Sequence, residues 1–285
     1  MQIVISALHF PWTSMADCCR RVRDELGLDG IELSWHPNLT RPHCTATDLD
    51  ELAASRRSHG LALSAHIWDN PAAREPEDAA TALCQWLPTC SRAGVTTLVL
   101  HGGRWPNQEA GIERVRRAIA AAAPRFAAAG VTLCLENHYA FDYQDCCELL
   151  SEPWEFRQVL DRSQRALGFC LDTGHAHMTR NWHDLIRDLA PVLRYVHLAD
   201  CHGVHDDHLG FRQGSVPWDG VFDALAGIGF DGTFCVEFPV RDDLAPFRSC
   251  LQELRARFGG KPPRPAGDPT LTPTRSTTGG CNVWR

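Results

Sequence analysis

The chain has 285 residues, a net charge of −7 at neutral pH and 44% hydrophobic residues. That length fits one large α/β domain or two small ones, with enough apolar residues for a sizeable core. The acidic balance argues against a protein that holds nucleic acid mainly through its phosphates. No apolar stretch reaches transmembrane length, so we expect no membrane partner.

The 13 cysteines are scattered along the chain and form no Cys-x-x-Cys pair, which argues against a zinc ribbon or a thioredoxin-type motif. Cys134, Cys170 and Cys235 lie inside apolar runs and are interpreted as small core residues. The odd count and the lack of a secretory signal predict a reducing, cytoplasmic location.

Strand-like and helix-like segments alternate along most of the chain. The strand-like runs are 2–8, 29–34, 61–66, 96–101, 131–136, 167–172, 194–199 and 233–238. Between them, residues such as Ile112, Val115, Ile119 and Phe126 share one helical face. Gly27, Gly60, Gly94 and Gly130 each follow a helix-like segment and precede a strand, where a helix-terminating glycine belongs.

Eight such units predict an α/β fold, a single (β/α)8 TIM barrel over residues 1–258. A doubly wound open sheet is the competing architecture, but no Gly-x-Gly-x-x-Gly follows the first strand and no P-loop is present. Residues 259–285 are rich in Pro, Gly and Thr, and we expect a flexible, disordered C-terminal tail there.

Residues of metal-ligand type recur at the ends of the predicted strands or in the loops that follow. They are His66, His101, Glu136, Asp172, His175, His197, Asp206, His208 and Glu237. Because a parallel barrel gathers the carboxyl ends of its strands at one mouth, we expect these side chains to converge.

Glu136, Asp172, His197 and Glu237 form the core of this set, each at the end of a predicted strand or inside it. Three carboxylates and one imidazole make a shell suited to a divalent ion such as Mn²⁺, Co²⁺, Mg²⁺ or Zn²⁺. Without a cation, three crowded carboxylates would repel one another. The sequence therefore predicts a divalent-metal site.

Four motifs carry a resemblance to a known superfamily: LEN at 135–137, LDTGH at 171–175, VHLAD at 196–200 and VEF at 236–238. They resemble the xylose-isomerase-like TIM barrels. This superfamily includes sugar phosphate isomerases and epimerases, ketose 3-epimerases, inosose isomerases and dehydratases, and apurinic-site endonucleases. The resemblance covers roughly residues 1–258 and implies that Glu136, Asp172, His197 and Glu237 bind the catalytic metal.

The other five residues leave the number of metals open. Together with the four core ligands, His66, His101, His175, Asp206 and His208 resemble the nine-ligand set of the three-zinc apurinic-site endonucleases. Isomerase-like members of the superfamily often keep several of these positions as substrate contacts and hold a single metal. One metal and two or three metals are therefore both compatible with the sequence.

Further residues near the predicted mouth are candidates for substrate contact. The candidates are His9, His66, Trp68, His101, Asn137, His138 and Arg212. Trp12, Trp35 and Trp105 also follow strands, and aromatic faces pack against the C–H faces of sugars. Glu32 is expected to point into the mouth. Lysine is nearly absent, which favours a non-phosphorylated sugar or cyclitol over a phosphate ester.

The function that suits this shell is a metal-dependent isomerase or epimerase acting on a sugar, ketose or cyclitol by proton transfer through a metal-stabilised enediolate. The resemblance implies that Glu136 and Glu237 both ligate the metal and move protons, and His175 would hold or polarise a substrate oxygen. The alternatives are a metal-dependent dehydratase of the inosose or dehydroshikimate type and a trinuclear-zinc phosphodiesterase. The oligomeric state stays open, a homo-oligomer included.

Overall fold

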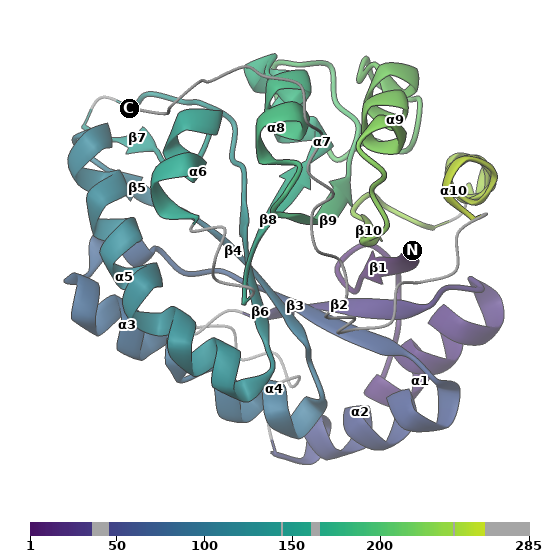
Figure 1. The fold of residues 1–285 in the computed structure, drawn as a ribbon. Helices are drawn as coiled ribbons and strands as arrows, with labels where there is room; N and C mark the ends of the chain where they lie inside the picture. Colours follow the sequence, from purple (N-terminus) through teal and green to yellow (C-terminus); the bar gives the residue numbers. More distant parts are fainter. Residues whose placement is uncertain (36–45, 144, 161–165, 242, 260–285) are drawn as a thin grey trace, which may run out of the picture.

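Eight parallel strands close into a barrel, with helices arranged around it, in a computed structural model that describes residues 1–35, 46–143, 145–160, 166–241 and 243–259 (Figure 1). The barrel strands are β1 (Gln2–Ser6), β2 (Gly30–Trp35), β3 (Ala62–Ile67), β4 (Thr97–His101), β6 (Thr132–Glu136), β8 (Leu167–Asp172), β9 (Leu193–Leu198) and β10 (Thr233–Val236). Their order around the barrel is β1-β10-β9-β8-β6-β4-β3-β2. The predicted (β/α)8 barrel is confirmed. Of the predicted tail, residues 260–285 lie outside the described residues.

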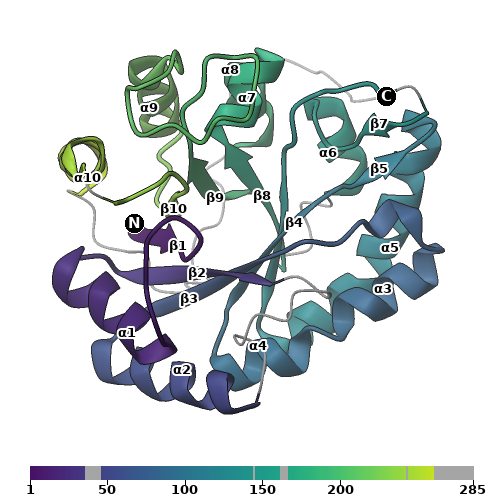
Figure 2. The same ribbon diagram turned by 180° about the vertical axis from the view of Figure 1, so that it is seen from behind.

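The helices lie on the outside of the barrel, as the view from behind also shows (Figure 2). They are α1 (Met15–Arg20), α2 (Ala46–His59), α3 (Pro76–Cys84), α4 (Leu87–Ala93), α5 (Gln108–Ala129), α6 (Pro153–Val159), α7 (Thr173–Thr179), α8 (Trp182–Leu189), α9 (Trp218–Gly227) and α10 (Ala245–Phe258). A π-helical turn, Arg21–Glu25, continues α1, and a 3-10 turn spans Pro71–Ala73.

Two short strands that the sequence did not predict lie in the loops after β4 and β6. They are β5 (Arg104–Trp105) and β7 (Cys147–Glu148), and they pair antiparallel, with Arg104 opposite Glu148. A two-residue strand is too short to display an alternating pattern. This small sheet ties together two loops at the carboxyl end of the barrel.

The register of the barrel places the polar strand-end residues side by side. His101 on β4 is opposite Glu136 on β6, and Asp172 on β8 is opposite His197 on β9. Glu237 directly follows the last residue of β10. Adjacent parallel strands lie about 4.8 Å apart, so residues in register are close neighbours.

Apolar side chains fill the inside of the barrel and the layer between its strands and the surrounding helices. Inside, Val4, Val99, Tyr195 and three cysteines form one buried cluster, and the Tyr195 hydroxyl is 2.7 Å from Ser64 Oγ. The larger cluster lies between strands and helices. Cys134, Cys170 and Cys235 are core residues, as predicted, and none of the cysteines in the described ranges forms a disulfide.

The predicted helix face and helix ends are also present. Ile112, Val115, Ile119 and Phe126 are all buried on α5. Gly94 and Gly130 end α4 and α5 in the left-handed conformation, with φ of 82° and 67°. Glycine adopts positive φ without the steric cost of a Cβ atom, so these two positions turn the chain into the next strand.

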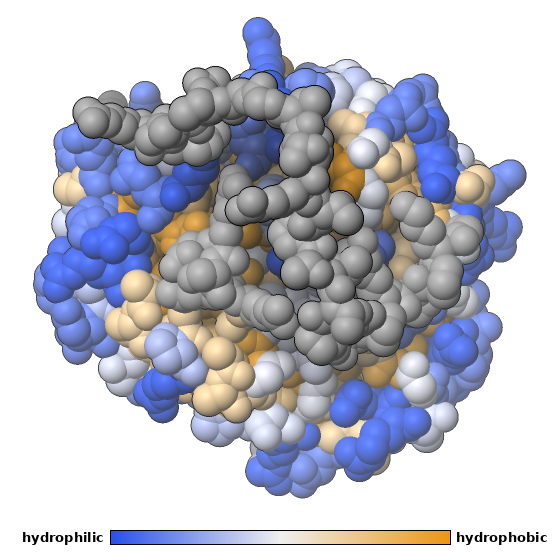
Figure 3. All heavy atoms as spheres, viewed as in Figure 1, coloured by the Kyte–Doolittle hydropathy of each residue, from blue (hydrophilic) through white to orange (hydrophobic). Residues whose placement is uncertain are grey.

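The outside of the barrel is polar where the helices face solvent. The periphery of the face seen in Figure 3 is mostly hydrophilic. None of the helices in the described ranges is both long enough and apolar enough to span a bilayer.

Replacing Phe126 tests the packing of α5 on the barrel. Phe126 is fully buried in the larger cluster, so Phe126→Ala should lower the free energy of unfolding by about 3–5 kcal/mol through lost burial and a cavity. Denaturant unfolding measures this, and Ile228→Ala, at a partly exposed position, is the control. Equal losses in the two variants would contradict the packing described here.

Candidate metal centre and active site

Four side chains of the predicted metal shell converge at the carboxyl end of the barrel. Glu136, Asp172, His197 and Glu237 each offer a ligand atom, and these atoms all lie within 4.8 Å of one another. All four residues are buried. They come from four consecutive strands of the barrel order, β6, β8, β9 and β10, so the barrel brings together residues that are up to a hundred positions apart in the sequence.

The His197 imidazole occupies the middle of this group. Its Nδ1 atom is 3.0 Å from Glu136 Oε1 and 2.9 Å from Glu237 Oε2. Neither contact has hydrogen-bond geometry, and His197 Nδ1 is a buried atom without a hydrogen-bond partner in the described structure. A ring nitrogen that faces two carboxylates without a hydrogen bond has the position expected of a metal ligand.

Unsatisfied buried atoms show that the group fits a cation. Glu136 Oε2, Asp172 Oδ2 and Glu237 Oε2 are also buried and make no hydrogen bond to the described residues. Buried polar atoms are normally paired, so a concentration of unpaired acceptors at one point calls for an explanation. A divalent ion held by three carboxylates and one imidazole would satisfy all four ligand atoms.

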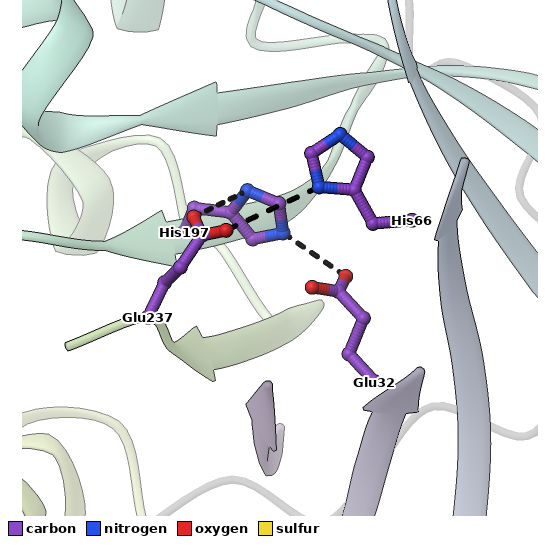
Figure 4. Close-up of side chains that lie close together, drawn as sticks. All are labelled: Glu32, His66, His197 and Glu237. Carbon is purple, nitrogen blue, oxygen red and sulfur yellow. Dashed lines mark hydrogen bonds and ion pairs between the residues drawn. The ribbon is translucent and has the colours of Figure 1, made fainter. Parts of the chain in front are cut away.

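Glu32 holds the opposite side of the His197 ring (Figure 4). Its Oε2 atom is 3.0 Å from His197 Nε2, and Glu32 is completely buried on β2. A carboxylate behind a ligating histidine fixes the ring orientation and leaves the other nitrogen free for the metal. Glu32 was expected to point into the mouth, but its carboxylate faces His197 Nε2.

A second group of histidines adjoins Glu136. The Nε2 atoms of His66 and His101 are 3.5 and 3.3 Å from Glu136 Oε2, and both are buried atoms without a hydrogen-bond partner among the described residues. His66 also reaches toward Glu237, with 4.0 Å between Nδ1 and Oε1 (Figure 4). His66, His101 and Glu136 together form a second group of candidate cation ligands next to the first.

Asp206 links the remaining two predicted residues. It lies between His175 and His208, with 3.3 Å from Oδ2 to His175 Nε2 and 3.3 Å from Oδ1 to His208 Nε2. His175 Nδ1 is 2.9 Å from the carbonyl oxygen of Asn137, and His208 Nδ1 is 2.8 Å from that of Glu237. Both rings therefore have acceptors at both nitrogens.

The charges of the centre depend on one another. Burial lowers the pKa of His175, but Asp172 and Asp206 raise it to about 10. Burial raises the pKa of Asp172 to about 7, helped by Glu237. Burial also raises the pKa of Glu237, yet His197 brings it down to about 2. Metal ligands must be deprotonated, so metal binding here would release protons.

Glu136 and Glu237 of this centre line a cavity of about 430 Å³ at the barrel mouth. Of the predicted residues, Glu136, His175 and Glu237 line it, as do His9, His66, Trp68, His101, His138, Asp206 and His208. Burial lowers the pKa of His9 to about 4 and that of His138 to about 3, so both rings are neutral donors or acceptors at pH 7. The cavity size is typical of a small-molecule site.

Two of the predicted substrate contacts, Asn137 and Arg212, do not line this cavity. The Asn137 amide donates to the Asp172 carbonyl and accepts from the Asp172 amide, at 3.1 and 2.8 Å, so it joins two strands and is not open to a substrate. Arg212 lies outside the cavity lining and pairs with Asp219 and Glu253. Carboxylates on α9 and α10 therefore neutralise the charge of Arg212. No pattern in the sequence predicted these ion pairs.

Of the four tryptophans expected at the mouth, Trp68 alone lines this cavity. Its ring is 46% exposed and stacks on His66, with 5.4 Å between ring centroids. Trp35 is buried against Trp86, and Trp12 and Trp105 pack against the hydrophobic core. The cavity thus has one aromatic wall.

Sequence reasoning missed several lining residues, among them Asp69, Asn70, Arg104 and Glu148. Asp69 and Asn70 follow Trp68 in the loop after β3. Arg104 and Glu148 belong to the unpredicted sheet β5–β7. The HGGRW run after β4 places an arginine three residues beyond His101, which could have drawn attention to Arg104.

The sequence matches a described family over most of its length. The family of xylose isomerase-like TIM barrels matches residues 21–257. A ketose 3-epimerase from Arthrobacter globiformis is 31% identical over 135 residues, which is 46% of this chain and 43% of that protein. The match therefore spans less than half the length of that curated relative.

Solved structures of epimerases share the fold. A D-psicose 3-epimerase studied in the presence of D-fructose superimposes with a TM-score of 0.72 at 19% identity, covering 91% of this chain and all of that one. A 3-keto-D-glucoside 4-epimerase from E. coli has a TM-score of 0.70 at 17% identity, covering 90% of this chain and 99% of that one. At these identities the likeness establishes the barrel.

Substitution of Glu32 tests its support of the centre. Glu32→Gln keeps the shape but weakens the hold on His197 Nε2, so the affinity for Mn²⁺ or Co²⁺ should fall about 10- to 100-fold. Calorimetric titration of chelator-stripped protein measures this. Glu113→Gln, on the exposed side of α5, is the matched control, and an affinity unchanged by Glu32→Gln would argue against the supporting role.

Proposed function

Because the chain belongs to the family of xylose isomerase-like TIM barrels, we propose that it is a divalent-metal-dependent epimerase of a small ketose or a related sugar. The observation that carries the proposal is the convergence of Glu136, Asp172, His197 and Glu237 at one point beside a cavity that Glu136 and Glu237 line. The ketose 3-epimerase relative supports the choice of epimerisation over dehydration.

The four converging residues would hold the ion, with His197 Nδ1 and one oxygen from each carboxylate as ligands. When bound, a divalent ion supplies positive charge that stabilises a substrate oxygen as it becomes negative. Glu32 keeps His197 in the ligating orientation. The donor set of three carboxylates and one imidazole is compatible with Mn²⁺, Co²⁺, Mg²⁺ or Zn²⁺.

Glu136 and Glu237 are the proposed pair that moves the proton. They come from β6 and β10, on either side of β8 and β9, so their carboxylates approach the cavity from different sides. One carboxylate would take the proton from the carbon next to the carbonyl, and the other would return a proton on the opposite face. Stereochemistry at that carbon would be inverted. Against the effect of burial, neighbouring histidines hold the pKa values of both carboxyl groups below their usual range, so each is ionised at rest and can act as the base, and the group that returns a proton must first take one from water.

We propose for His175 a role other than the expected contact with a substrate oxygen. Its two ring nitrogens face the Asn137 carbonyl and the Asp206 carboxylate, and its raised pKa keeps it protonated. In this proposal its positive charge stabilises the anionic state of Glu136, whose Oε1 is 3.7 Å from His175 Nδ1. The neutral rings of His9 and His138 are better placed to contact substrate oxygens directly.

A second candidate, the phosphodiesterase with several zinc ions, is favoured by one observation. The unpaired Nε2 atoms of His66 and His101 beside Glu136 are arranged as ligands of a further cation. The cavity lining argues against it, because a DNA backbone calls for several cationic contacts and Arg104 is the one Arg or Lys among the described lining residues.

Metal stoichiometry separates the two candidates. We expect about one tightly bound equivalent of divalent metal per chain, because the two groups of four converging ligand residues among the described residues share His197 and Glu237. Chelator treatment should remove it and abolish activity, with recovery on adding Mn²⁺ or Co²⁺. Elemental analysis of purified protein measures the ratio, and two or three equivalents together with cleavage of an abasic-site duplex would favour the phosphodiesterase.

Solvent exchange tests the proton transfer itself. During turnover in deuterium oxide, the metal-loaded enzyme should introduce deuterium at the inverted carbon of D-fructose, D-psicose or D-tagatose, detected by NMR. Glu136→Gln and Glu237→Gln should each lower the rate about 10²- to 10⁴-fold, because each removes a proton-transfer group. Glu113→Gln is the control, and the absence of exchange into any ketose of a broad panel would refute the proposal.

A further inference from the structure

We propose that Arg104 and Glu148 form a subsite that hydrogen-bonds the hydroxyls at the end of the substrate farther from the metal ligands, and that selects an uncharged polyol end over a phosphorylated one. This inference rests on the proposed function, since it assigns the part of the substrate that the metal centre does not reach. It concerns two residues of the small sheet β5–β7, outside the predicted ligand set.

One carboxylate oxygen of Glu148 is hydrogen-bonded within the protein, and the other has no hydrogen bond to the described residues. Glu148 Oε1 accepts from Arg104 Nε at 2.5 Å and from the Tyr143 hydroxyl at 3.1 Å. Glu148 Oε2 points toward His138, 3.9 Å from Nδ1, which is beyond hydrogen-bond reach. Glu148 is buried although it lines the cavity, so the open acceptor is shielded from bulk water.

Arg104 presents the donors of the subsite. Its side chain is half exposed, and the guanidinium lies over the Tyr143 ring at 4.4 Å. Its Nε atom is used by Glu148, and among the described residues no other hydrogen bond engages the terminal nitrogens. A hydroxyl is both donor and acceptor, so it can donate to Glu148 Oε2 and accept from the guanidinium at once.

A chain of rings separates the pair from the metal centre. His101 Nε2 is 3.3 Å from Glu136 Oε2, the His101 and His138 rings are 5.0 Å apart, and His138 adjoins Glu148. Both ends of this chain line the same cavity. A sugar whose carbonyl end lies at Glu136 would therefore direct its other end toward Arg104.

The charge of the Arg104–Glu148 pair determines whether an uncharged or a phosphorylated end of the substrate fits the subsite. Arg104 is the one Lys or Arg side chain among the described residues that line the cavity, and Glu148 neutralises it. A phosphate there would meet the buried Glu148 carboxylate and would have to compete for a guanidinium that is already bonded. Trp68 offers an aromatic face for the C–H groups of the same substrate segment.

Substrates of two lengths and two charges test the subsite with metal-loaded enzyme. A ketohexose carries the distal hydroxyls, a ketotetrose lacks them, and a ketohexose 6-phosphate replaces one with an anion. Arg104→Gln and Glu148→Gln should each lower kcat/KM for the ketohexose about 10- to 100-fold, mainly by raising KM. The kcat/KM for the ketotetrose should change less than about twofold in either variant. Glu148→Gln releases Arg104, so it should also raise the preference for the phosphate over the free ketohexose at least tenfold.

The control is Arg157→Gln, which breaks a similarly exposed ion pair with Asp188 outside the cavity. Losses that are equal for the long and the short ketose, with the preference for phosphate unchanged, would show a merely structural pair and overturn the subsite. Because Arg104 is half exposed, Arg104→Gln decides the question even if Glu148→Gln does not fold. Absence of turnover by the wild-type enzyme on every ketose would overturn the proposed function, and the subsite with it.

Discussion

Three buried carboxyl groups share one buried imidazole at the mouth of this barrel, and the surrounding polar groups are arranged around that concentration of negative charge. Glu136 and Glu237 both approach His197 Nδ1 within about 3 Å. Like charges held this close and away from water are unfavourable unless cations compensate them. Within the protein, His197 and His175 carry that compensation, and a divalent ion would provide it in the form of the protein that we propose to be active.

The supporting residues can be understood from this constraint. Glu32 holds one side of His197, so that the other side faces the carboxylates. Asp206 and the Asn137 carbonyl hold His175 in its charged form beside Asp172. The Asn137 amide locks β6 to the end of β8 through the Asp172 backbone. Each of these contacts limits the movement of a candidate ligand, and metal sites depend on such positioning.

Polarity changes with depth in the cavity. The buried lining residues Glu136 and Glu237 carry unpaired ligand atoms, histidines line much of the cavity, and Arg104 and Trp68 are among its more exposed lining residues. Such a gradient suits a small molecule with a reactive carbonyl at one end and hydroxyls at the other. The epimerases that share this fold act on sugars of several kinds according to their names, and the outer wall is where loops can differ without disturbing the barrel.

The sequence by itself determined the barrel and the convergence of the four central candidate ligands. Eight apolar runs with helical segments between them specify parallel strands, and a polar residue at the end of a buried strand has one direction in which to point. Glu136, Asp172, His197 and Glu237 were predictable for that reason. The tertiary structure alone decided which other residues lie near them and which are drawn away. Arg104 and Glu148 meet across two-residue strands from different loops, Glu32 turns to His197 from the far side of the barrel, and Arg212 is drawn away by carboxylates on two helices. The periodic backbone of the barrel positions the strand ends, and this periodicity is visible in the sequence. The contacts of the other side chains depend on which groups lie nearby, and with what charge, in the folded chain.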